Sequence, residues 1–304
     1  EDPRPGPGEL LVRVHAAGVN YIDTYRRSGV YPMPFPHVPG VEGSGEVLEV
    51  GDGAPFAVGE RVAWFSARGS YAELAVVPAA EALRVPAGVD LDTAAALPLQ
   101  GLTAHYLVRS TFPVEAGTTI LLTAGAGGVG QLVIQLAKAR GATVITTVGS
   151  GRKAFLARDA GADHVLVTEG MDLPADLPAA VRALAPRGVD VSFDGVGRDT
   201  FDATLACLRP RGMQVLFGGA SGQVPPFDLQ RLNALGSLYV TRPSLGHYVA
   251  DRAELDWRAD ELFGMLRTGA LRVRISLREG LAAARSAHEA LEGRATTGKV
   301  ILTA

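Results

Sequence analysis

The stretch TTILLTAGAGGVGQLVIQLAKARG, at residues 118–141, decides the fold. Its apolar run Ile120–Thr123 is bounded by polar residues and glycine, which predicts a buried strand. A G-x-G-x-x-G turn follows directly at Gly125–Gly130. Apolar residues then recur at the spacing of one helix face, and Gly141 stands where a C-cap glycine would end that helix.

A strand, a glycine turn and a helix in this order are what the pyrophosphate of a dinucleotide needs. Glycines let the backbone approach closely, and the helix N-terminus offers free N–H groups and the positive end of its dipole. The turn residues predicted to contact the cofactor are Gly125, Gly127, Gly128, Val129 and Gly130. The alternative is a glycine-rich turn that binds no ligand.

Composition places the chain among soluble globular proteins. It has 304 residues, of which 47% are hydrophobic and 20% charged, with a net charge of −3, and this length suits two domains. Near-neutral charge gives no reason to expect a nucleic-acid partner, and no apolar run approaches a membrane span. The single cysteine, Cys207, excludes an intrachain disulfide and a multi-cysteine zinc site and favours a cytoplasmic location.

The rhythm of the chain changes twice. Residues 1–100 carry short alternating runs, which predict the strands of a small β-barrel, at Glu9–Ala16, Gly45–Val50, Glu60–Phe65 and Tyr71–Val77. Residues 101–246 alternate strands with helices, which predicts a doubly wound parallel sheet. Its expected strands are Thr119–Ala124, Thr143–Val148, His164–Val167, Val189–Phe193, Met213–Phe217 and Ser237–Thr241. Residues 247–304 return to a mixed pattern and are expected to rejoin the first domain.

Seven motifs along the chain point to a family. They are GVNYIDTYRRSGVYP, PGVEGSGEV, LQGLTAHYLV, AGAGGVG, FDGVGRDT, GSLYVTRPSL and RATTGKV. In this order they resemble the zeta-crystallin-like NADPH:quinone oxidoreductases, in particular the bacterial quinone reductase branch of the medium-chain dehydrogenase/reductase superfamily. The resemblance implies an α/β fold: a GroES-like β-barrel catalytic domain, a Rossmann NADPH-binding domain and a cleft between them. It also implies a homodimer through the edge strand Ser237–Thr241.

The resemblance also leads to an expectation about catalytic zinc. Zinc-dependent relatives hold their metal with a cysteine and a histidine at positions that match Asn20 and Val41 here. An amide and a valine cannot replace these ligands, and catalytic zinc needs three protein ligands. We therefore expect no metal, with Glu42 as a structural carboxylate. A quinone or an activated enone accepts hydride without a Lewis acid, provided that the protein orients it and excludes water.

Site residues follow from the same resemblance. It places Asn20, Tyr25 and Tyr31 beside the nicotinamide and the substrate, with Asn20 and Tyr25 also contacting the cofactor. The tyrosines either donate a proton to a developing oxyanion or simply line an apolar wall. Further implied cofactor contacts are Thr103, Tyr106, Thr168, Val196, Phe217, Gly218, Gly219, Pro243, Ser244, Leu245 and Arg294. Thr168 stands where the family often has a tyrosine. For Thr103 and Tyr106 the alternative role is helix packing.

The segment after the second strand of the doubly wound sheet predicts NADPH rather than NADH. An NAD enzyme of this fold usually ends that strand with a carboxylate for the ribose 2′-hydroxyl. Here Gly149, Ser150 and Gly151 follow the strand, and Arg152 and Lys153 come next. The hydroxyl and the charges favour a 2′-phosphate bound by Gly149, Ser150 and Lys153.

Two other functions remain open at this stage. An NADPH-dependent enone or 2-alkenal reductase would use the same cleft and the same hydride donor. A non-catalytic NADPH-binding protein, crystallin-like or RNA-binding, is the alternative from another class. The acidic net charge and the lack of a basic stripe with interleaved aromatic residues count against RNA. Asp194, at the end of a predicted strand, is expected to stabilise a turn.

Overall fold

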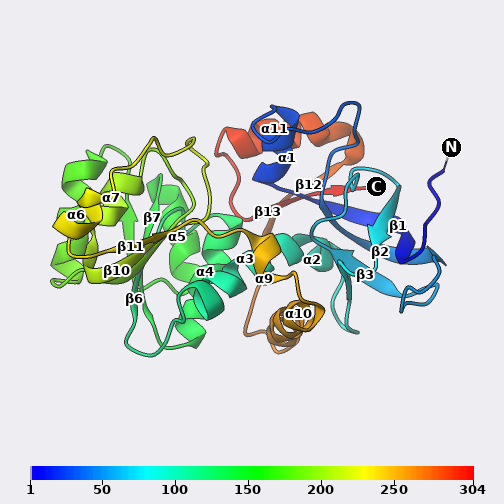
Figure 1. Cartoon of the computed structure of the whole chain (residues 1–304), viewed down its shortest axis with the longest axis horizontal. Helices are drawn as coiled ribbons and strands as arrows, with labels where there is room; N and C mark the ends of the chain where they lie inside the picture. Colours follow the sequence, from blue (N-terminus) through cyan, green and yellow to red (C-terminus); the bar gives the residue numbers. More distant parts are fainter. Residues whose placement is uncertain (1) are drawn as a thin grey trace. The chain divides into compact units, whose positions relative to one another are not determined.

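The computed structural model describes residues 2–304. The chain forms two compact units: unit 1 comprises Glu1–Leu102 and Asp251–Ala304, and unit 2 comprises Thr103–Ala250 (Figure 1). The sequence pattern changes at residues 100 and 246, close to these two crossings. Unit 1 is therefore built from both ends of the chain.

Unit 1 contains a seven-stranded sheet in the order β12-β13-β1-β2-β3-β5, with β4 paired to β1. Its strands are β1 (Glu9–Val19), β2 (Glu42–Val50), β3 (Arg61–Trp64), β4 (Leu74–Pro78), β5 (Ala82–Arg84), β12 (Ile275–Gly280) and β13 (Lys299–Thr303). Alternating residues of β1, β2 and β3 meet in a buried core around Val12, Val47 and Trp64. The antiparallel pairing of β1 with β13 brings the first strand of the chain against the last.

The helices of unit 1 are short, except one. They are α1 (Tyr21–Arg27), α2 (Leu91–Ala96), α10 (Arg252–Arg267), the 3₁₀ turn Leu281–Ala283 and α11 (Ala284–Glu292). Asp90 is the N-cap of α2, and its carboxylate accepts a hydrogen bond from Thr93 N at 2.8 Å. Helix α3 (Pro98–Tyr106) and the π-turn Leu107–Thr111 lead into unit 2.

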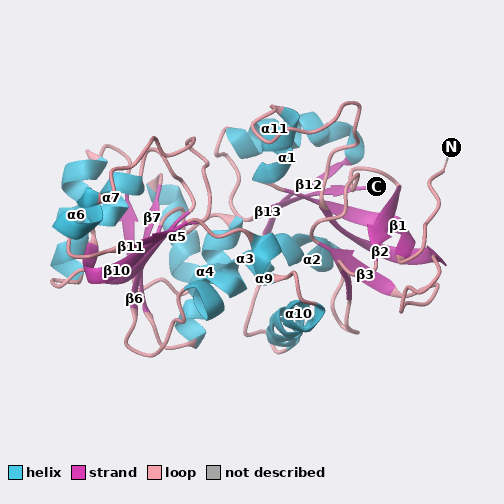
Figure 2. Cartoon of the chain, in the orientation of Figure 1, coloured by secondary structure: helices cyan, strands magenta, loops and turns pink. Residues whose placement is uncertain are grey.

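Unit 2 is the doubly wound sheet that the sequence predicts. Six parallel strands lie in the order β11-β10-β9-β6-β7-β8. Figure 2 shows strands of this sheet in magenta with helices in cyan around them. They are β6 (Thr119–Leu122), β7 (Thr143–Val148), β8 (His164–Val167), β9 (Val189–Asp194), β10 (Leu208–Leu216) and β11 (Tyr239–Thr241). The order reverses between β6 and β9, and such a switch point is where these folds bind ligands.

Helices cover both faces of this sheet. Helices α4 (Gly128–Ala139) and α5 (Gly151–Asp159) lie on one side, and α6 (Leu173–Leu184) and α7 (Phe201–Ala206) lie on the other (Figure 1). Leu177 and Val181 of α6 pack with Leu121 and Ile145 of the sheet in one buried cluster. The short helices α8 (Gln230–Ala234) and α9 (Leu245–Tyr248) flank β11.

Several predicted boundaries need correction. Strand β6 ends at Leu122 rather than Ala124, because Ala124 has a φ of 55° and starts the glycine turn. Strand β11 begins at Tyr239 rather than Ser237, because Ser237 has a φ of 57°. Strand β10 begins five residues earlier than expected, at Leu208. At Ala124 and Ser237 the left-handed backbone is incompatible with an extended strand, and a hydrophobicity pattern does not reveal it.

Candidate functional site

The glycine turn has the geometry that the motif requires. Gly125 N donates to Thr147 O at 3.0 Å, and Gly127 is the N-cap of α4. A Cβ at Gly125 would lie 2.2 Å from the Thr146 Oγ1 atom, and one at Gly130 would lie 2.4 Å from Ala124 O. Larger residues would therefore separate the helix from the sheet at both positions. The N-terminus of α4 is held directly at the carboxyl end of β6, as pyrophosphate binding requires.

The end of β7 carries the features expected for a 2′-phosphate. Ser150 is the N-cap of α5, and its side chain makes no capping bond within the described chain. The first turn contains no acidic residue, and it begins with Gly151, Arg152 and Lys153. A hydroxyl, helix N–H groups and positive side chains thus gather where the chain leaves the second strand of the sheet.

The remaining predicted contacts of unit 2 follow the carboxyl ends of the other strands. Thr168 comes after β8, and its Oγ1 atom donates to Val148 O at 3.3 Å, which ties it to the end of β7. Val196 comes after β9, and Phe217, Gly218 and Gly219 come after β10. A Cβ at Gly218 would lie 2.4 Å from Gly195 O, so the two loops touch. The structure therefore gathers these positions at one edge of the sheet.

Asp194 fixes the loop after β9, which is the turn role expected for it. Its Oδ1 atom accepts hydrogen bonds from Thr123 Oγ1 at 3.0 Å, Thr200 Oγ1 at 2.8 Å and Val196 N at 2.9 Å. The side chain is buried, and burial raises the pKa of this carboxyl although these donors lower it. Asp194 organises the loop and is not available to a ligand.

Pro243, Ser244 and Leu245 lie at the start of α9, beyond β11. Tyr248 at the end of α9 stacks on Tyr106, with ring centroids 4.4 Å apart and planes 8° apart. Tyr106 is 2% exposed, so its ring is packed inside unit 2. Thr103, one turn earlier on α3, is 9% exposed.

In unit 1, the predicted residue Asn20 precedes α1 and is 4% exposed. Its Nδ2 atom donates to Glu42 Oε2 at 2.7 Å and to Gly18 O at 3.2 Å. Its Oδ1 atom accepts from Lys299 Nζ at 2.7 Å. The amide group is thus held in one orientation by its neighbours, and any cofactor contact through Oδ1 would add to these bonds.

Glu42 and Lys299 form an ion pair inside unit 1. Both side chains are fully buried. Glu42 also accepts from Leu99 N at 2.7 Å, so each charged group has hydrogen bonds as well as its counterion. The structural role expected for Glu42 is confirmed. The structural role of Lys299 was not predicted from the sequence, where its signal was a lysine at the start of the apolar strand KVILT.

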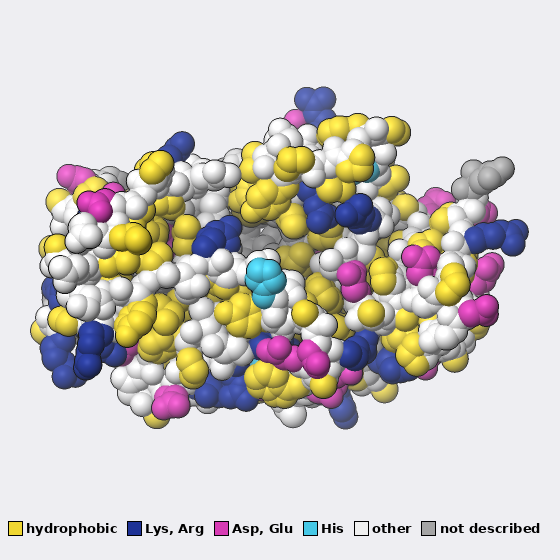
Figure 3. Space-filling view, viewed as in Figure 1, with side chains coloured by type: hydrophobic (Ala, Val, Ile, Leu, Met, Phe, Trp, Pro, Cys, Tyr) yellow, Lys and Arg dark blue, Asp and Glu magenta, His cyan; other side chains and the backbone are white. Residues whose placement is uncertain are grey.

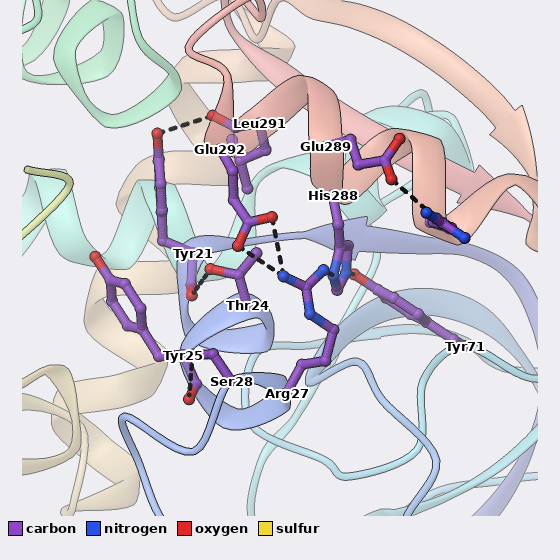
Figure 4. A network of polar contacts seen from close by, with 11 residues as sticks. Tyr21, Thr24, Tyr25, Arg27, Ser28, Tyr71, His288, Glu289, Leu291 and Glu292 are labelled. Atoms are coloured by element: carbon purple, nitrogen blue, oxygen red, sulfur yellow. Dashed lines mark hydrogen bonds and ion pairs between the residues drawn. The ribbon is translucent and has the colours of Figure 1, made fainter.

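A chain of polar contacts anchors α1 to α11 (Figure 4). The Arg27 guanidinium donates to Glu292 Oε1 at 2.7 Å and to His288 Nδ1 at 3.1 Å. His288 Nε2 lies 3.1 Å from Tyr71 Oη, which donates to Asp23 Oδ2 at 3.1 Å. Because Arg27 occupies Nδ1, the neutral imidazole carries its proton on Nε2 and donates to Tyr71. Burial, together with Arg27, lowers the pKa of His288.

This network was also missed in the sequence. Asp23 stands three residues after the N-cap Asn20 and accepts from Asn20 N at 2.9 Å, which is half of a capping box. That spacing was the available signal for α1. The helix has only seven residues and shows no clear apolar period, so its hydrophobicity pattern did not reveal it.

The two predicted catalytic tyrosines contact each other. The rings of Tyr25 and Tyr31 meet edge to face, with centroids 5.5 Å apart, and Tyr31 is 40% exposed. In Figure 4 the Tyr25 hydroxyl points away from the Arg27–His288 contacts. Arg294, the predicted phosphate contact of unit 1, follows α11 with a φ of 55°. Its charge lies near Tyr21, where it opposes the increase in pKa that burial causes.

The positions that match zinc ligands hold other groups. Val41 is 2% exposed and apolar, and the Asn20 amide is bonded to the ammonium group of Lys299. Among residues 2–304, no group of three or more His, Cys, Asp or Glu side chains has an arrangement that could hold a metal ion.

Two family models match the chain, one in each half. The model described as "Alcohol dehydrogenase GroES-like domain" matches residues 6–87, and the model described as "Zinc-binding dehydrogenase" matches residues 128–259. The first range covers most of the N-terminal part of unit 1. The second begins at the N-terminus of α4 and extends into α10.

Individual proteins match over nearly the whole chain. A quinone oxidoreductase of Pseudomonas aeruginosa is 45% identical, over 98% of this chain and 92% of its own length. A 2-haloacrylate reductase of a Burkholderia species is 39% identical, over 98% of this chain and 91% of its own. A mycobacterial protein solved in complex with NADPH is 50% identical with a TM-score of 0.96, over 100% of this chain and 94% of that one.

Proposed function

Since the chain belongs to the quinone oxidoreductase family of the medium-chain dehydrogenase/reductase superfamily, we propose that it is an NADPH-dependent quinone reductase. The observation that carries this proposal is the arrangement of residues at the carboxyl ends of the strands of unit 2. There the glycine turn, the Ser150 cap and the loops after β9 and β10 come together. The NADPH complex of a relative that matches this chain with a TM-score of 0.96 supports the cofactor.

The chain's own residues fit NADPH. Gly125–Gly130 present backbone N–H groups to a pyrophosphate, and Ser150 and Lys153 receive the 2′-phosphate. When bound, NADPH supplies the hydride that the acceptor takes up. Tyr25 and Tyr31 form an aromatic wall for a flat acceptor ring, and the exposed Tyr31 Oη atom donates a hydrogen bond to the acceptor oxygen. Orientation of the acceptor and exclusion of water are then the contributions of the protein.

The direct test is NADPH oxidation followed by absorbance with 1,4-benzoquinone as acceptor and an α,β-unsaturated aldehyde in parallel. Quinone-dependent oxidation supports the proposal. Faster turnover of the unsaturated aldehyde, or of 2-chloroacrylate, would favour the enone reductase alternative. We include 2-chloroacrylate as an acceptor because a 2-haloacrylate reductase is 39% identical to this chain. NADPH binding without turnover of any acceptor would indicate a non-catalytic binding protein.

Nucleic acid is not a proposed partner. The net charge is −3. On the face that Figure 3 shows, Lys and Arg side chains stand in small separate groups among acidic and apolar ones. No helix in the described part of the chain is long and apolar enough to cross a membrane.

Cys207 is buried and forms no disulfide, and burial raises its thiol pKa to about 12. We propose a cytoplasmic location, which suits an enzyme whose one cysteine is a free thiol.

We expect catalysis without zinc. Three protein ligands are needed for a catalytic zinc ion, and the matching positions hold the bonded Asn20 amide and the apolar Val41 side chain. Prolonged treatment with a chelator is therefore expected to leave the quinone-dependent rate unchanged. Elemental analysis of the purified protein should give well under one zinc per chain. Activity that is lost on chelation and restored by zinc would contradict this mechanism.

We also propose a homodimer through β11. This strand lies at the end of the sheet, and Tyr239 and Val240 on it are 59% and 38% exposed. An open edge strand of this kind pairs readily with its own copy about a two-fold axis. Light scattering at micromolar concentration should give twice the 31.7 kDa chain mass. Val240→Pro, which removes one strand N–H, should shift the mass towards the monomer. A monomeric wild-type chain would contradict the proposal.

A further inference from the structure

A cavity of about 160 Å³ that is open to solvent lies in unit 1, with the exposed side chains of Val38 and Arg68 in its lining. Its lining comes from α1, from the segment at residues 33–40 and from the turn at residues 68–69. Apolar walls are provided by Met33, Pro34 and Val38, and neither Tyr25 nor Tyr31 is part of the lining. The volume is close to that of an engineered cavity that holds benzene, about 150 Å³, so a small organic molecule would fit.

Asp23 lines this cavity and is 2% exposed. Its Oδ2 atom accepts from Asn20 N at 2.9 Å and from Tyr71 Oη at 3.1 Å. Its Oδ1 atom has no hydrogen-bond partner anywhere in residues 2–304. A buried polar atom without a partner is costly and uncommon in native proteins. A ligand that reached the Asp23 carboxyl group from the cavity would give this oxygen the partner that it lacks.

Two arginines line the same cavity. Arg26 lies one helical turn after Asp23 on α1, and Arg68 lies on the facing turn. Within the described residues, neither guanidinium takes part in an ion pair or a side-chain hydrogen bond. Arg68 acts only at longer range on Glu81, whose pKa it lowers against the effect of burial. Two uncompensated guanidinium groups at one cavity favour an anion, and guanidinium geometry suits a carboxylate best.

We propose that this cavity binds a small carboxylate, held by Arg26 and Arg68 and by a hydrogen bond donated from the protonated Oδ1 atom of Asp23. The apolar walls would receive the short carbon chain of the ligand. Such a site is distinct from the NADPH and quinone contacts proposed above, because none of those residues lines it. Failure of the proposed reaction would therefore not exclude this carboxylate site, and failure of the site would not exclude the reaction.

The protonation of Asp23 fits this role. Burial raises the pKa of its carboxyl to about 7, with Glu42 of β2 adding to the rise, while Asn20 N–H, Lys299 of β13 and Tyr71 lower it. The other charged or titratable groups around it are Arg26, His37 and Arg68 on the cavity and His288 beyond Tyr71. Below pH 7 the carboxyl is mostly neutral and can donate. Above pH 7 it becomes an anion and repels a carboxylate.

The test is isothermal titration of the full chain with sodium propionate against a chloride blank of equal ionic strength. The expected dissociation constant rises about tenfold between pH 6 and pH 8, since binding needs the proton whose pKa lies near the middle of that range. At pH 8, heats measured in buffers of different ionisation enthalpy should show uptake of nearly one proton per bound propionate. Propionate itself is ionised at both values.

Variants separate the parts of the site. Asp23→Asn keeps an N–H donor at this position at every pH, so the pH dependence of propionate binding should become clearly smaller than in the wild type. Arg26→Gln and Arg68→Gln should each weaken binding about ten- to a hundredfold, the effect of one charge-assisted hydrogen bond. Arg267→Gln is the matched control, because Arg267 is an exposed arginine of α10 outside the cavity, and it should bind as the wild type does. Circular dichroism confirms that each variant is folded.

Three results would overturn the proposal. The first is equal affinity for propionate in the wild type and both arginine variants. The second is a wild-type affinity that does not change between pH 6 and pH 8. The third is a pH dependence that is undiminished in Asp23→Asn. NADPH binding measured on the same samples distinguishes these failures from failure of the proposed function, since NADPH should bind to all five proteins alike.

Discussion

Replacing Lys299 with methionine is expected to destabilise the protein by about 3–5 kcal/mol, the usual effect of removing one partner of a buried ion pair. The Lys299 ammonium and the Glu42 carboxylate are both fully buried. The variant leaves an unpaired carboxylate in the interior and removes the hydrogen bond to Asn20 Oδ1. Domains are stable by only about 5–15 kcal/mol in total, so urea denaturation at pH 7 should show a large decrease in the free energy of unfolding.

Two further variants make this result specific. Glu42→Gln combined with Lys299→Met removes both charges and keeps an amide for Leu99 N, so its cost should be smaller than the sum of the two single changes. Lys138→Met is the matched control. Lys138 pairs with Asp163 at 2.8 Å, but both side chains are about one-third exposed, and such pairs contribute about 0–1 kcal/mol. Equal losses in Lys299→Met and Lys138→Met would show that burial of the pair is not decisive.

The Lys153→Ala variant is expected to raise the KM for NADPH about ten- to a hundredfold and to leave the KM for NADH nearly unchanged. The reason is the site after β7, where the N-cap Ser150 has no side-chain capping bond in residues 2–304 and no acidic residue stands in the first turn of α5. Lys153, in the first turn of α5, is the residue proposed to contact the 2′-phosphate, and losing one charge-assisted hydrogen bond costs about 1.5–3 kcal/mol.

Arg158→Ala provides the control for this measurement. Arg158 lies in the last turn of the same helix and is exposed. Its replacement therefore removes one positive charge from the helix, as Lys153→Ala does, but at the end away from the proposed phosphate site. Steady-state rates with both cofactors and 1,4-benzoquinone give the four Michaelis constants. A wild-type preference for NADH, or equal effects of Lys153→Ala on the two cofactors, would show that this loop does not recognise the 2′-phosphate.

The sequence predicted the alternating strands and helices of unit 2, although the bounds of β6, β10 and β11 differ, because most of these segments have a local apolar pattern. The strands Thr143–Val148 and His164–Val167 were placed with their observed bounds, and a helix follows the glycine turn as predicted. Parallel strands buried on both faces form continuous apolar runs, and the helices between them are amphipathic. Because the carboxyl ends of parallel strands share one edge, the strand order then brings the predicted cofactor residues of unit 2 together.

The polar interior of unit 1 could not be predicted in the same way. Asn20, Glu42 and Lys299 are far apart in the sequence, and the spacing between them carries no period. Their contact depends on β1 pairing with β13 and β2, which is a property of the sheet and not of any segment. The unpartnered Oδ1 atom of Asp23 is equally invisible in the sequence, since a missing hydrogen bond leaves no mark on composition or periodicity.

The pairing of β1 with β13 also determines which of the two units can complete its fold first during translation. Strand β13 ends one residue before the end of the sequence and lies between β1 and β12 in the sheet. A nascent chain that has emerged through residue 250 already contains every strand of unit 2, whereas unit 1 still lacks β12 and β13. Until translation reaches residue 299, Glu42 has no counterion. We expect the middle of the chain to become protease-resistant during synthesis before its beginning does.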